Sequence, residues 1–338
     1  MRGKRYIAVE LDPPERNAVA KDGSAGAGSF LVEGARELAR AGADAITIAD
    51  NPAGRVRADS AVMACKVARE AGVLAIPHLT CRDRSREAIK STLLALDAEG
   101  LHTVLAVTGD RDRPPRTPES TGPGRAPSRF ASGWSSERLA GAIGAWGTDS
   151  FSRPFRVWGA LNVNARNFRA ELERARRKAA AGVCAFLTQP AFTDAAFGNL
   201  ALARAELGYP ILGGVLPVVS ERNADFLARG EIPGISVDES VARRFAGASR
   251  EEAADISVGY ALSLARRMET YVDGWYVITP FARVDIVARL VRALAAESRT
   301  PESGTRPAAR GSPRLTHDFQ RLPHEPEDAL VEVDVLRP

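Results

Sequence analysis

Short apolar runs recur along the chain and alternate with segments in which apolar residues follow helical spacing. The runs predict strands at residues 6–11, 45–50, 73–78, 103–108, 155–162, 183–189, 210–216 and 274–279. The segments between and after them predict helices at residues 30–40, 60–70, 87–99, 136–145, 168–181, 195–207 and 284–296. Several helices end on a glycine, the residue that most easily adopts the left-handed backbone of a helix end. These glycines are Gly42, Gly72, Gly100 and Gly182.

This alternation predicts an α/β fold with a parallel sheet, because parallel neighbours need a crossover connection, usually a helix. Eight strands are the number at which such a sheet closes into a barrel filled by side chains. We therefore predict a (β/α)8 TIM barrel over residues 1–297. An open doubly wound sheet is the alternative, but it requires a glycine-rich phosphate turn after the first strand. Asp12-Pro13-Pro14-Glu15 stands there instead.

Three segments depart from the alternation. Residues 220–270 are too long for one crossover helix, so we expect extra helices before the last strand, with a turn at Pro233-Gly234. Residues 111–132 are rich in proline without periodicity and predict a long loop after the fourth strand. Residues 298–338 are rich in Pro, Arg, Ser and Glu and predict a mostly disordered tail.

Composition narrows the class of protein. The net charge is only +4, and basic and acidic residues alternate along predicted helices such as 170–178, which argues against nucleic-acid binding. No apolar run is long enough to span a membrane and the N-terminus has no signal-peptide pattern, so we expect a cytoplasmic protein. Cys65, Cys81 and Cys184 are widely spaced and odd in number, which is typical of reduced thiols rather than of disulfides or a zinc site.

Polar residues follow the predicted strands, whose carboxyl ends share one face in such a barrel. They are Glu10, Thr47, Asp50, Asn51, His78, Thr80, Thr108, Asp110, Asn162, Asn164, Gln189, Ser220, Arg222 and Asn223. Taken singly, Glu10 could be a solvated strand end and His78 a structural histidine. Taken together, they predict a binding mouth for a large polar ligand. The set has no nucleophile with a partnered base, which suits a site where one acid donates a proton and a bound cofactor does the harder chemistry.

Seven stretches in order resemble the methylenetetrahydrofolate reductases, in particular the reductase module fused to homocysteine methyltransferases in some bacteria. They are VELDPP (9–14), ITIADNP (46–52), HLTCRDR (78–84), LAVTGD (105–110), LTQP (187–190), LP with SERNADFL (216–217 and 220–227) and ITPF (278–281). The resemblance covers residues 4–294 and implies a flavin-binding barrel, in agreement with the strand count. It also implies that NADH or NADPH reduces bound FAD, after which methylenetetrahydrofolate is reduced to 5-methyltetrahydrofolate.

The resemblance implies roles at the matching positions. Glu10 matches the general acid that protonates the folate's bridging nitrogen, a role for which its pKa should be raised by a partly dry pocket. Asp110 matches the aspartate beside flavin and pterin, and Gln189 matches the glutamine that hydrogen-bonds folate. The positions that match cofactor contacts are Thr47, His78, Thr80, Asp110, Phe130, Ala131, Asn162, Arg166 and Lys178.

Some residues depart from the family pattern. Thr108 stands where better-known members carry an arginine, Asn162-Val163-Asn164 lacks the usual proline, and the proline-rich loop is unlike the family's shorter one. Because these departures lie around the expected cofactor, they leave a second hypothesis open: a flavin-poor module that binds folate and works with a methyltransferase partner. A barrel lyase or aldolase is disfavoured, because the strand ends carry no lysine for a Schiff base. The choice of NADH or NADPH, the oligomeric state (relatives are often dimers or tetramers) and a separate methyltransferase partner stay open.

Overall fold

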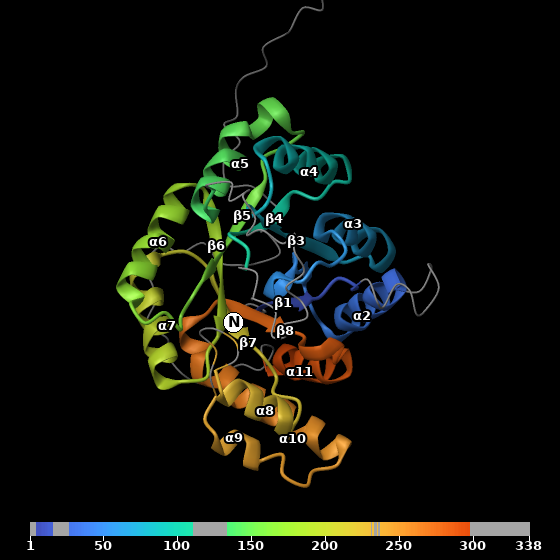
Figure 1. Ribbon diagram of the computed structural model, residues 1–338, viewed down its shortest axis with the longest axis vertical. Helices are drawn as coiled ribbons and strands as arrows, with labels where there is room; N and C mark the ends of the chain where they lie inside the picture. The colour runs from blue at the N-terminus through green and yellow to red at the C-terminus, as the bar shows by residue number, and fades with distance from the viewer. Residues whose placement is uncertain are drawn as a thin grey trace, which may run out of the picture.

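The computed structural model describes residues 5–15, 27–110, 134–230, 232, 235 and 237–297. Within them, eight parallel strands close into a barrel in sequence order, which confirms the TIM barrel over the open sheet (Figure 1). The strands are β1 (Tyr6–Leu11), β2 (Ala45–Ile48), β3 (Leu74–Thr80), β4 (Thr103–Val107), β5 (Arg156–Leu161), β6 (Val183–Pro190), β7 (Ile211–Val215) and β8 (Gly274–Ile278). The predicted loop at 111–132, the turn at Pro233-Gly234 and the tail at 298–338 lie outside the described residues.

Helices surround the barrel on its outer side (Figure 1). They are α2 (Ala27–Ala41), α3 (Ser60–Ala71), α4 (Arg86–Ala98), α5 (Ser136–Ser150), α6 (Phe168–Ala180), α7 (Asp194–Leu207), α8 (Glu221–Ala228), α9 (Ser240–Arg243), α10 (Arg250–Met268) and α11 (Val284–Glu297). Between β7 and β8, α8, α9 and α10 gather at one end of the molecule's long axis, which confirms the extra helices predicted before the last strand. No helix in the described part of the chain is long and apolar enough to cross a membrane.

Side chains of each strand alternate between two apolar cores, as β1 illustrates. Ile7, Val9 and Leu11 pack in the core between the strands and the helices. Tyr6 and Ala8 take the other side and pack in the lumen of the barrel. The lumen core also contains Ala45, Ile76, Leu105, Trp158, Ala185, Leu187, Leu212 and Tyr276. Because both faces of a strand are covered, its sequence is apolar nearly throughout. Glu10 continues the luminal side of β1 toward its carboxyl end.

Most predicted element boundaries lie close to the observed ones, but α5 runs to Ser150 rather than 145, α2 begins at Ala27 rather than 30, and β3 ends later than predicted. Gly72 has a φ of +66° and its N–H bonds to the Ala68 carbonyl, so it ends α3 as the glycine signal predicts. The strand β3, predicted to end at His78, continues to Thr80 because Thr80 still pairs with Val107 of β4. His78 therefore lies inside the strand and on its luminal side, two residues after Ile76.

Candidate functional site

Glu10 lies at the carboxyl-end mouth of the barrel, where three strands place polar groups together. Tyr276 from β8 donates its phenolic hydrogen to Glu10 Oε2. His78 Nε2 from β3 lies 3.6 Å from the same oxygen, and the Glu10 side chain is only 16% exposed. The buried Thr47 hydroxyl from β2 lies close enough to Tyr276 to lower the pKa of its phenol, but the geometry of the pair falls short of a hydrogen bond. The mouth therefore holds a mostly buried carboxyl whose direct hydrogen-bond donor is a neutral group.

The surroundings of Glu10 raise its pKa from an ordinary 4.5 to about 7. Burial is the main cause, because a charged carboxylate loses its hydration. The nearby carboxylates of Asp12 and Asp110 raise this pKa further, while the hydrogen bond from Tyr276 opposes the rise. Burial lowers the pKa of His78 to about 3, so His78 is neutral near pH 7 and brings no positive charge to Glu10. About half of the Glu10 carboxyls then carry a proton near neutral pH, as a general acid requires.

Several buried polar atoms near the strand ends have no hydrogen-bond partner among the described residues. They are His78 Nε2, Gln189 Oε1 and Thr279 Oγ1, with Trp158 Nε1 deeper in the lumen core. Leaving such an atom unpaired costs about 1–3 kcal/mol, so a group of them calls for an explanation. A polar ligand that enters the mouth and supplies partners explains why they are there.

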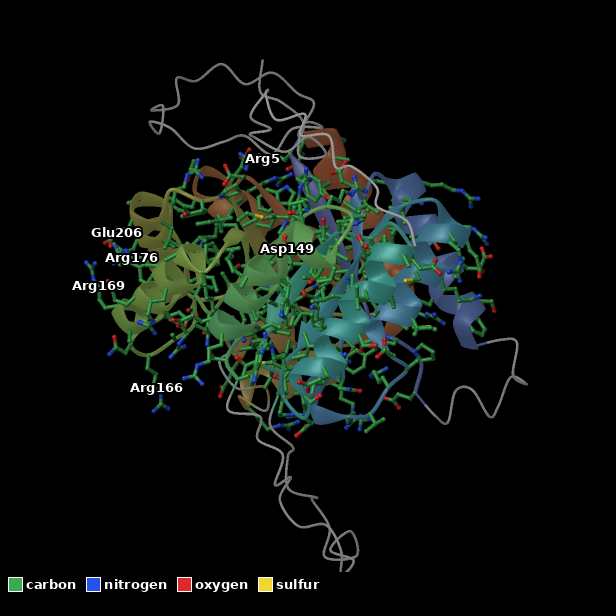
Figure 2. The ribbon with its side chains drawn as sticks, turned by 90° about the horizontal axis from the view of Figure 1, so that it is seen from above. Arg5, Asp149, Arg166, Arg169, Arg176 and Glu206 are labelled. Atoms are coloured by element: carbon green, nitrogen blue, oxygen red, sulfur yellow. The ribbon has the colours of Figure 1, made fainter. Side chains whose placement is uncertain are left out.

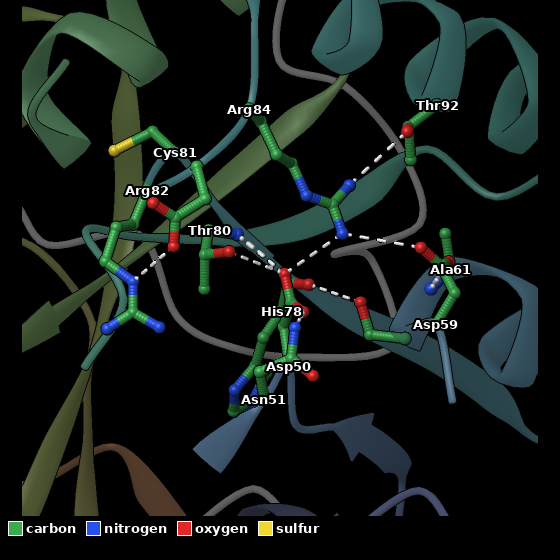
Figure 3. Close-up of polar contacts among 12 residues, drawn as sticks. Asp50, Asn51, Asp59, Ala61, His78, Thr80, Cys81, Arg82, Arg84 and Thr92 are labelled. Atoms are coloured by element: carbon green, nitrogen blue, oxygen red, sulfur yellow. Dashed lines mark hydrogen bonds and ion pairs between the residues drawn. The ribbon is translucent and has the colours of Figure 1, made fainter. Parts of the chain in front are cut away.

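Asp50 anchors the loop after β2 to the end of β3 (Figure 3). Its Oδ2 accepts hydrogen bonds from Thr80 N at 3.1 Å and from Thr80 Oγ1 at 2.7 Å. Arg84 Nη2 lies 3.3 Å from the same oxygen and 3.4 Å from Asp59, the N-cap residue of α3. Thr80, predicted to contact flavin, thus gives its hydroxyl hydrogen to Asp50 and keeps only lone pairs for a ligand.

Asp110 lies exposed at the rim, at the end of the segment that follows β4. Its Oδ2 accepts a hydrogen bond from Ala53 N at 2.7 Å, which ties this segment to the loop after β2. Left-handed backbone at non-glycine residues gathers in the loops on this face, after β2, β3 and β8. These residues are Asn51, Ala53, Asp83, Phe281 and Ala282. Such conformations cost about 1–3 kcal/mol each and cluster at functional sites, which points to this face.

The residues predicted to hold the cofactor's ribose and phosphates lie farther from Glu10. Asn162 Oδ1 accepts from Asn164 N at 2.9 Å within the loop after β5. Arg166 is exposed and points away from the body of the protein (Figure 2). Lys178 is 5% exposed, and its ammonium donates to the Ala160 carbonyl at 2.6 Å. To reach a ligand, Lys178 would have to break that bond. Phe130 and Ala131 lie outside the described residues.

A cavity of about 470 Å³ adjoins the Arg166 loop. Its walls come from the loop after β5, the start of α6 and α7, and the segment after α8. The lining residues include Asn164, Arg166, Phe168, Asn199 and Ile235. The structure thus brings Glu10, Thr47 and His78 together in the mouth, puts Gln189 on the same end of the barrel, and leaves Arg166 at the wall of this cavity. Among the described residues, no group of three or more His, Cys, Asp and Glu side chains could hold a metal ion.

Sequence reasoning missed Tyr276 and the effect of Asp12. Tyr276 stands in an apolar strand, where a tyrosine reads as part of the core. The signal that could have found it is the closure of the barrel. When β8 pairs with β1, Tyr276 lies opposite Ala8, the luminal residue that precedes Glu10 on β1. Asp12 lies in the VELDPP stretch, but only the fold shows that its carboxylate raises the pKa of Glu10.

Comparison with known proteins places the chain in a family. A family model described as methylenetetrahydrofolate reductase matches residues 2–277. No curated protein matches the chain. The structure is similar to an uncharacterized protein from Clostridium thermocellum that binds two copies of 5-methyl-5,6,7,8-tetrahydrofolic acid, with a TM-score of 0.55 and 13% identity over 88% of this chain and 95% of that one. At this identity the likeness shows the fold alone.

A weaker likeness, with a TM-score of 0.47 and 16% identity, is to dihydropteroate synthase from Xanthomonas albilineans, over 89% of this chain and 96% of that one. The family model is more informative than either structure, because it extends from before β1 into β8 and includes Glu10, Asp110 and Gln189. The chain belongs to the methylenetetrahydrofolate reductase family.

Proposed function

We propose that the protein reduces 5,10-methylenetetrahydrofolate to 5-methyltetrahydrofolate with electrons from NADH or NADPH, through bound FAD, and so serves one-carbon metabolism and methionine supply. The observation that carries this proposal is Glu10, a mostly buried carboxyl at the barrel mouth with a pKa of about 7. Opening the folate's five-membered ring requires a proton donor at neutral pH. Family membership and the folate bound by the Clostridium thermocellum protein support the same class of substrate.

The residues of the mouth fit the ring of a flavin, which carries both hydrogen-bond donors and acceptors. Among the described residues, His78 Nε2 and Gln189 Oε1 are buried without hydrogen-bond partners, and the Thr80 hydroxyl retains lone pairs. Thr47, His78, Thr80 and Asp110 are the residues that we propose hold the ring. When bound, FAD supplies hydride transfer between the nicotinamide and the folate. The protein contributes binding, orientation and the proton.

Glu10 supplies the proton in this proposal. Its carboxyl gives a hydrogen ion to the bridging nitrogen of the folate, and the ring opens to an iminium cation. The carboxylate that remains keeps the hydrogen bond from Tyr276, which favours the charged form. Asp110 adds a negative charge near the rim that favours the cationic iminium. Because the pKa of Glu10 is about 7, the proton is available below pH 7 and the folate step slows above it.

Gln189 is proposed to bind the folate. It lies in β6, and its Oε1 is buried with no hydrogen-bond partner among the described residues. A side-chain amide can accept from an N–H of the pterin and donate to a ring nitrogen with its own amino group. The buried oxygen would then gain the partner that it lacks.

A second candidate function is folate binding without FAD, in concert with a methyltransferase. The observation that favours it is Lys178, whose ammonium is bonded to the Ala160 carbonyl and whose burial lowers its pKa. A residue predicted to hold the cofactor's phosphates is therefore engaged inside the protein. This candidate keeps the folate site and gives up the reductase chemistry.

Anaerobic absorption spectra separate the two candidates. Purified protein is mixed with FAD and passed over a desalting column, and its flavin spectrum is followed during addition of NADH, or NADPH in parallel, and then of methylenetetrahydrofolate. A reductase retains the flavin, loses its visible band with the nicotinamide and regains it with the folate. Protein that binds 5-methyltetrahydrofolate in a calorimeter but retains no flavin supports the second candidate and contradicts the first.

A further inference from the structure

Two side chains approach the Glu10 carboxyl, and both lie at the same oxygen. The Tyr276 hydroxyl donates to Oε2, and His78 Nε2 lies 3.6 Å from Oε2. No described residue donates a hydrogen bond to Oε1. The carboxyl is therefore asymmetric: one oxygen is held by the protein, and the other is left for whatever enters the mouth.

The position of Tyr276 keeps its hydroxyl at Oε2 of Glu10. It is 6% exposed and packs in the lumen core, where β8 closes against β1. Burial and the neighbouring carboxyl raise the pKa of its phenol well above 10, so it keeps its hydrogen and remains a donor at any working pH. A phenylalanine would fill the same apolar space. Packing alone therefore does not account for the hydroxyl.

We propose that Tyr276 is a positioning residue that directs the transferable proton of Glu10 to Oε1, the oxygen that meets the folate. This inference rests on the proposed function. The carbonyl oxygen of a carboxylic acid accepts hydrogen bonds better than its hydroxyl oxygen, so a donor on Oε2 makes Oε2 the carbonyl and leaves the proton on Oε1. In the transfer, the O–H bond at Oε1 breaks, its electron pair stays on that oxygen, and an N–H bond forms on the bridging nitrogen. The negative charge then spreads to Oε2, where Tyr276 stabilises it.

Titratable groups from several elements surround Glu10 and affect the pH at which it ionises. Asp12 lies directly after β1, Asp110 follows β4, His78 comes from β3 and Tyr276 from β8. Loop β2 to α3 contributes Asp50, which is held by Arg84. Of these groups, Tyr276 is the one whose hydrogen bond favours the charged form of Glu10. Removing that bond should raise the pKa of Glu10, because the carboxylate loses its donor while burial and both nearby carboxylates remain.

Infrared difference spectra over pH, on protein without substrate, test the assignment. The carbonyl band of a protonated carboxyl that disappears in Glu10→Gln belongs to Glu10. In Tyr276→Phe we expect this band at higher frequency, because a hydrogen bond to the carbonyl oxygen is lost, and titrating at higher pH. Tyr6→Phe is the matched control, since Tyr6 is another tyrosine on the luminal side of the barrel, at the far end of β1. It should leave the band and its titration unchanged.

The same variants in the flavin-loaded protein link position to rate. We expect Tyr276→Phe to slow flavin reoxidation by methylenetetrahydrofolate about tenfold even at a pH where Glu10 is fully protonated, because the proton is no longer held in one place. An unchanged band, titration and rate in Tyr276→Phe overturn the proposal. If Tyr276→Phe shows the expected band shift but the wild-type protein takes up no flavin, the reductase function is refuted and the assignment of Oε1 and Oε2 still stands.

A second variant covers the case in which Tyr276→Phe does not fold. Replacing Tyr276 alone with 3-fluorotyrosine changes the side chain's size very little and makes the phenol a stronger donor. The stronger hydrogen bond should move the Glu10 titration to lower pH and its band to lower frequency, the reverse of the phenylalanine effect. A titration that does not move with the fluorinated residue overturns the proposal.

Discussion

Two buried carboxylates near the same end of the barrel have opposite electrostatic surroundings. Asp50 accepts two hydrogen bonds from Thr80, and the guanidinium of Arg84 balances its charge. Glu10 has a neutral phenol as its donor and two further carboxylates nearby, and its pKa is about 7. A buried acid beside a cation acts as an anchor, whereas a buried acid without one holds a proton near neutral pH. The same chemical group therefore serves structure in one loop and chemistry in the next.

The largest expected effect is on the rate of folate reduction, and it tests the chemical role of Glu10. Glu10→Gln should slow reduction of methylenetetrahydrofolate about 100- to 10,000-fold, the usual contribution of a general acid. Oxidation of NADH with an artificial electron acceptor should stay largely intact, because that half-reaction needs no proton from Glu10. Stopped-flow measurement of each half-reaction checks this. If both half-reactions fall together, Glu10 serves binding or structure instead.

Removing the anchor should reduce stability more than it alters chemistry. Asp50→Ala leaves the Thr80 donors without their acceptor and removes one of the two carboxylates that pair with Arg84, for an expected loss of about 3–5 kcal/mol in the free energy of unfolding. Urea unfolding followed by circular dichroism measures the loss. Asp59→Ala is the control, because Asp59 is 44% exposed and acts as a helix cap worth about 0.5–2 kcal/mol. Equal losses in the two variants would contradict the anchoring role of Asp50.

The raised pKa of Glu10 also predicts how stability depends on pH. The unfolded chain ionises Glu10 near 4.5 and the folded protein near 7, so the folded state binds more protons between these values. The contribution of Glu10 to the free energy of unfolding is therefore fully present below pH 4.5, and it falls by about 3 kcal/mol as pH rises through 7. Glu10→Gln removes that loss. In urea unfolding the variant should match the wild type at pH 4.5 and exceed it at pH 8; a variant equally stable to the wild type at both values would show that Glu10 is not held protonated.

The smallest expected effect concerns Gln189. Gln189→Ala removes one neutral hydrogen bond to folate, worth about 0.5–1.5 kcal/mol, so folate affinity should fall about two- to twelvefold. Flavin retention after desalting should not change. Isothermal titration calorimetry with 5-methyltetrahydrofolate measures the affinity, and Asn199→Ala, on the wall of the cavity beside Arg166, serves as the control. Unchanged folate affinity in Gln189→Ala removes this residue from the site.

Part of the site could be predicted from the chain, because the relevant residues follow apolar runs whose ends must share one face of a parallel barrel. This reasoning groups Glu10, Thr47 and His78, and the structure places them together. Lys178 could not be placed by the same reasoning. It lies on a helix, and only the packing of α6 against β5 shows its ammonium on the Ala160 carbonyl. Helical spacing indicates which side of a helix is apolar, but not which carbonyl a long side chain will reach.

The sequence by itself determined the alternation of strands and helices, the number of strands and most of the element boundaries. Strands covered on both faces must be apolar along their length, and the glycines after helices mark where the backbone turns left-handed. Tertiary structure alone decided the chemistry of Glu10. Its donor, Tyr276, is 266 residues away and reaches it only because β8 closes the barrel against β1. Its pKa depends on burial and on the charges around it in space, and neither quantity exists until the barrel has closed.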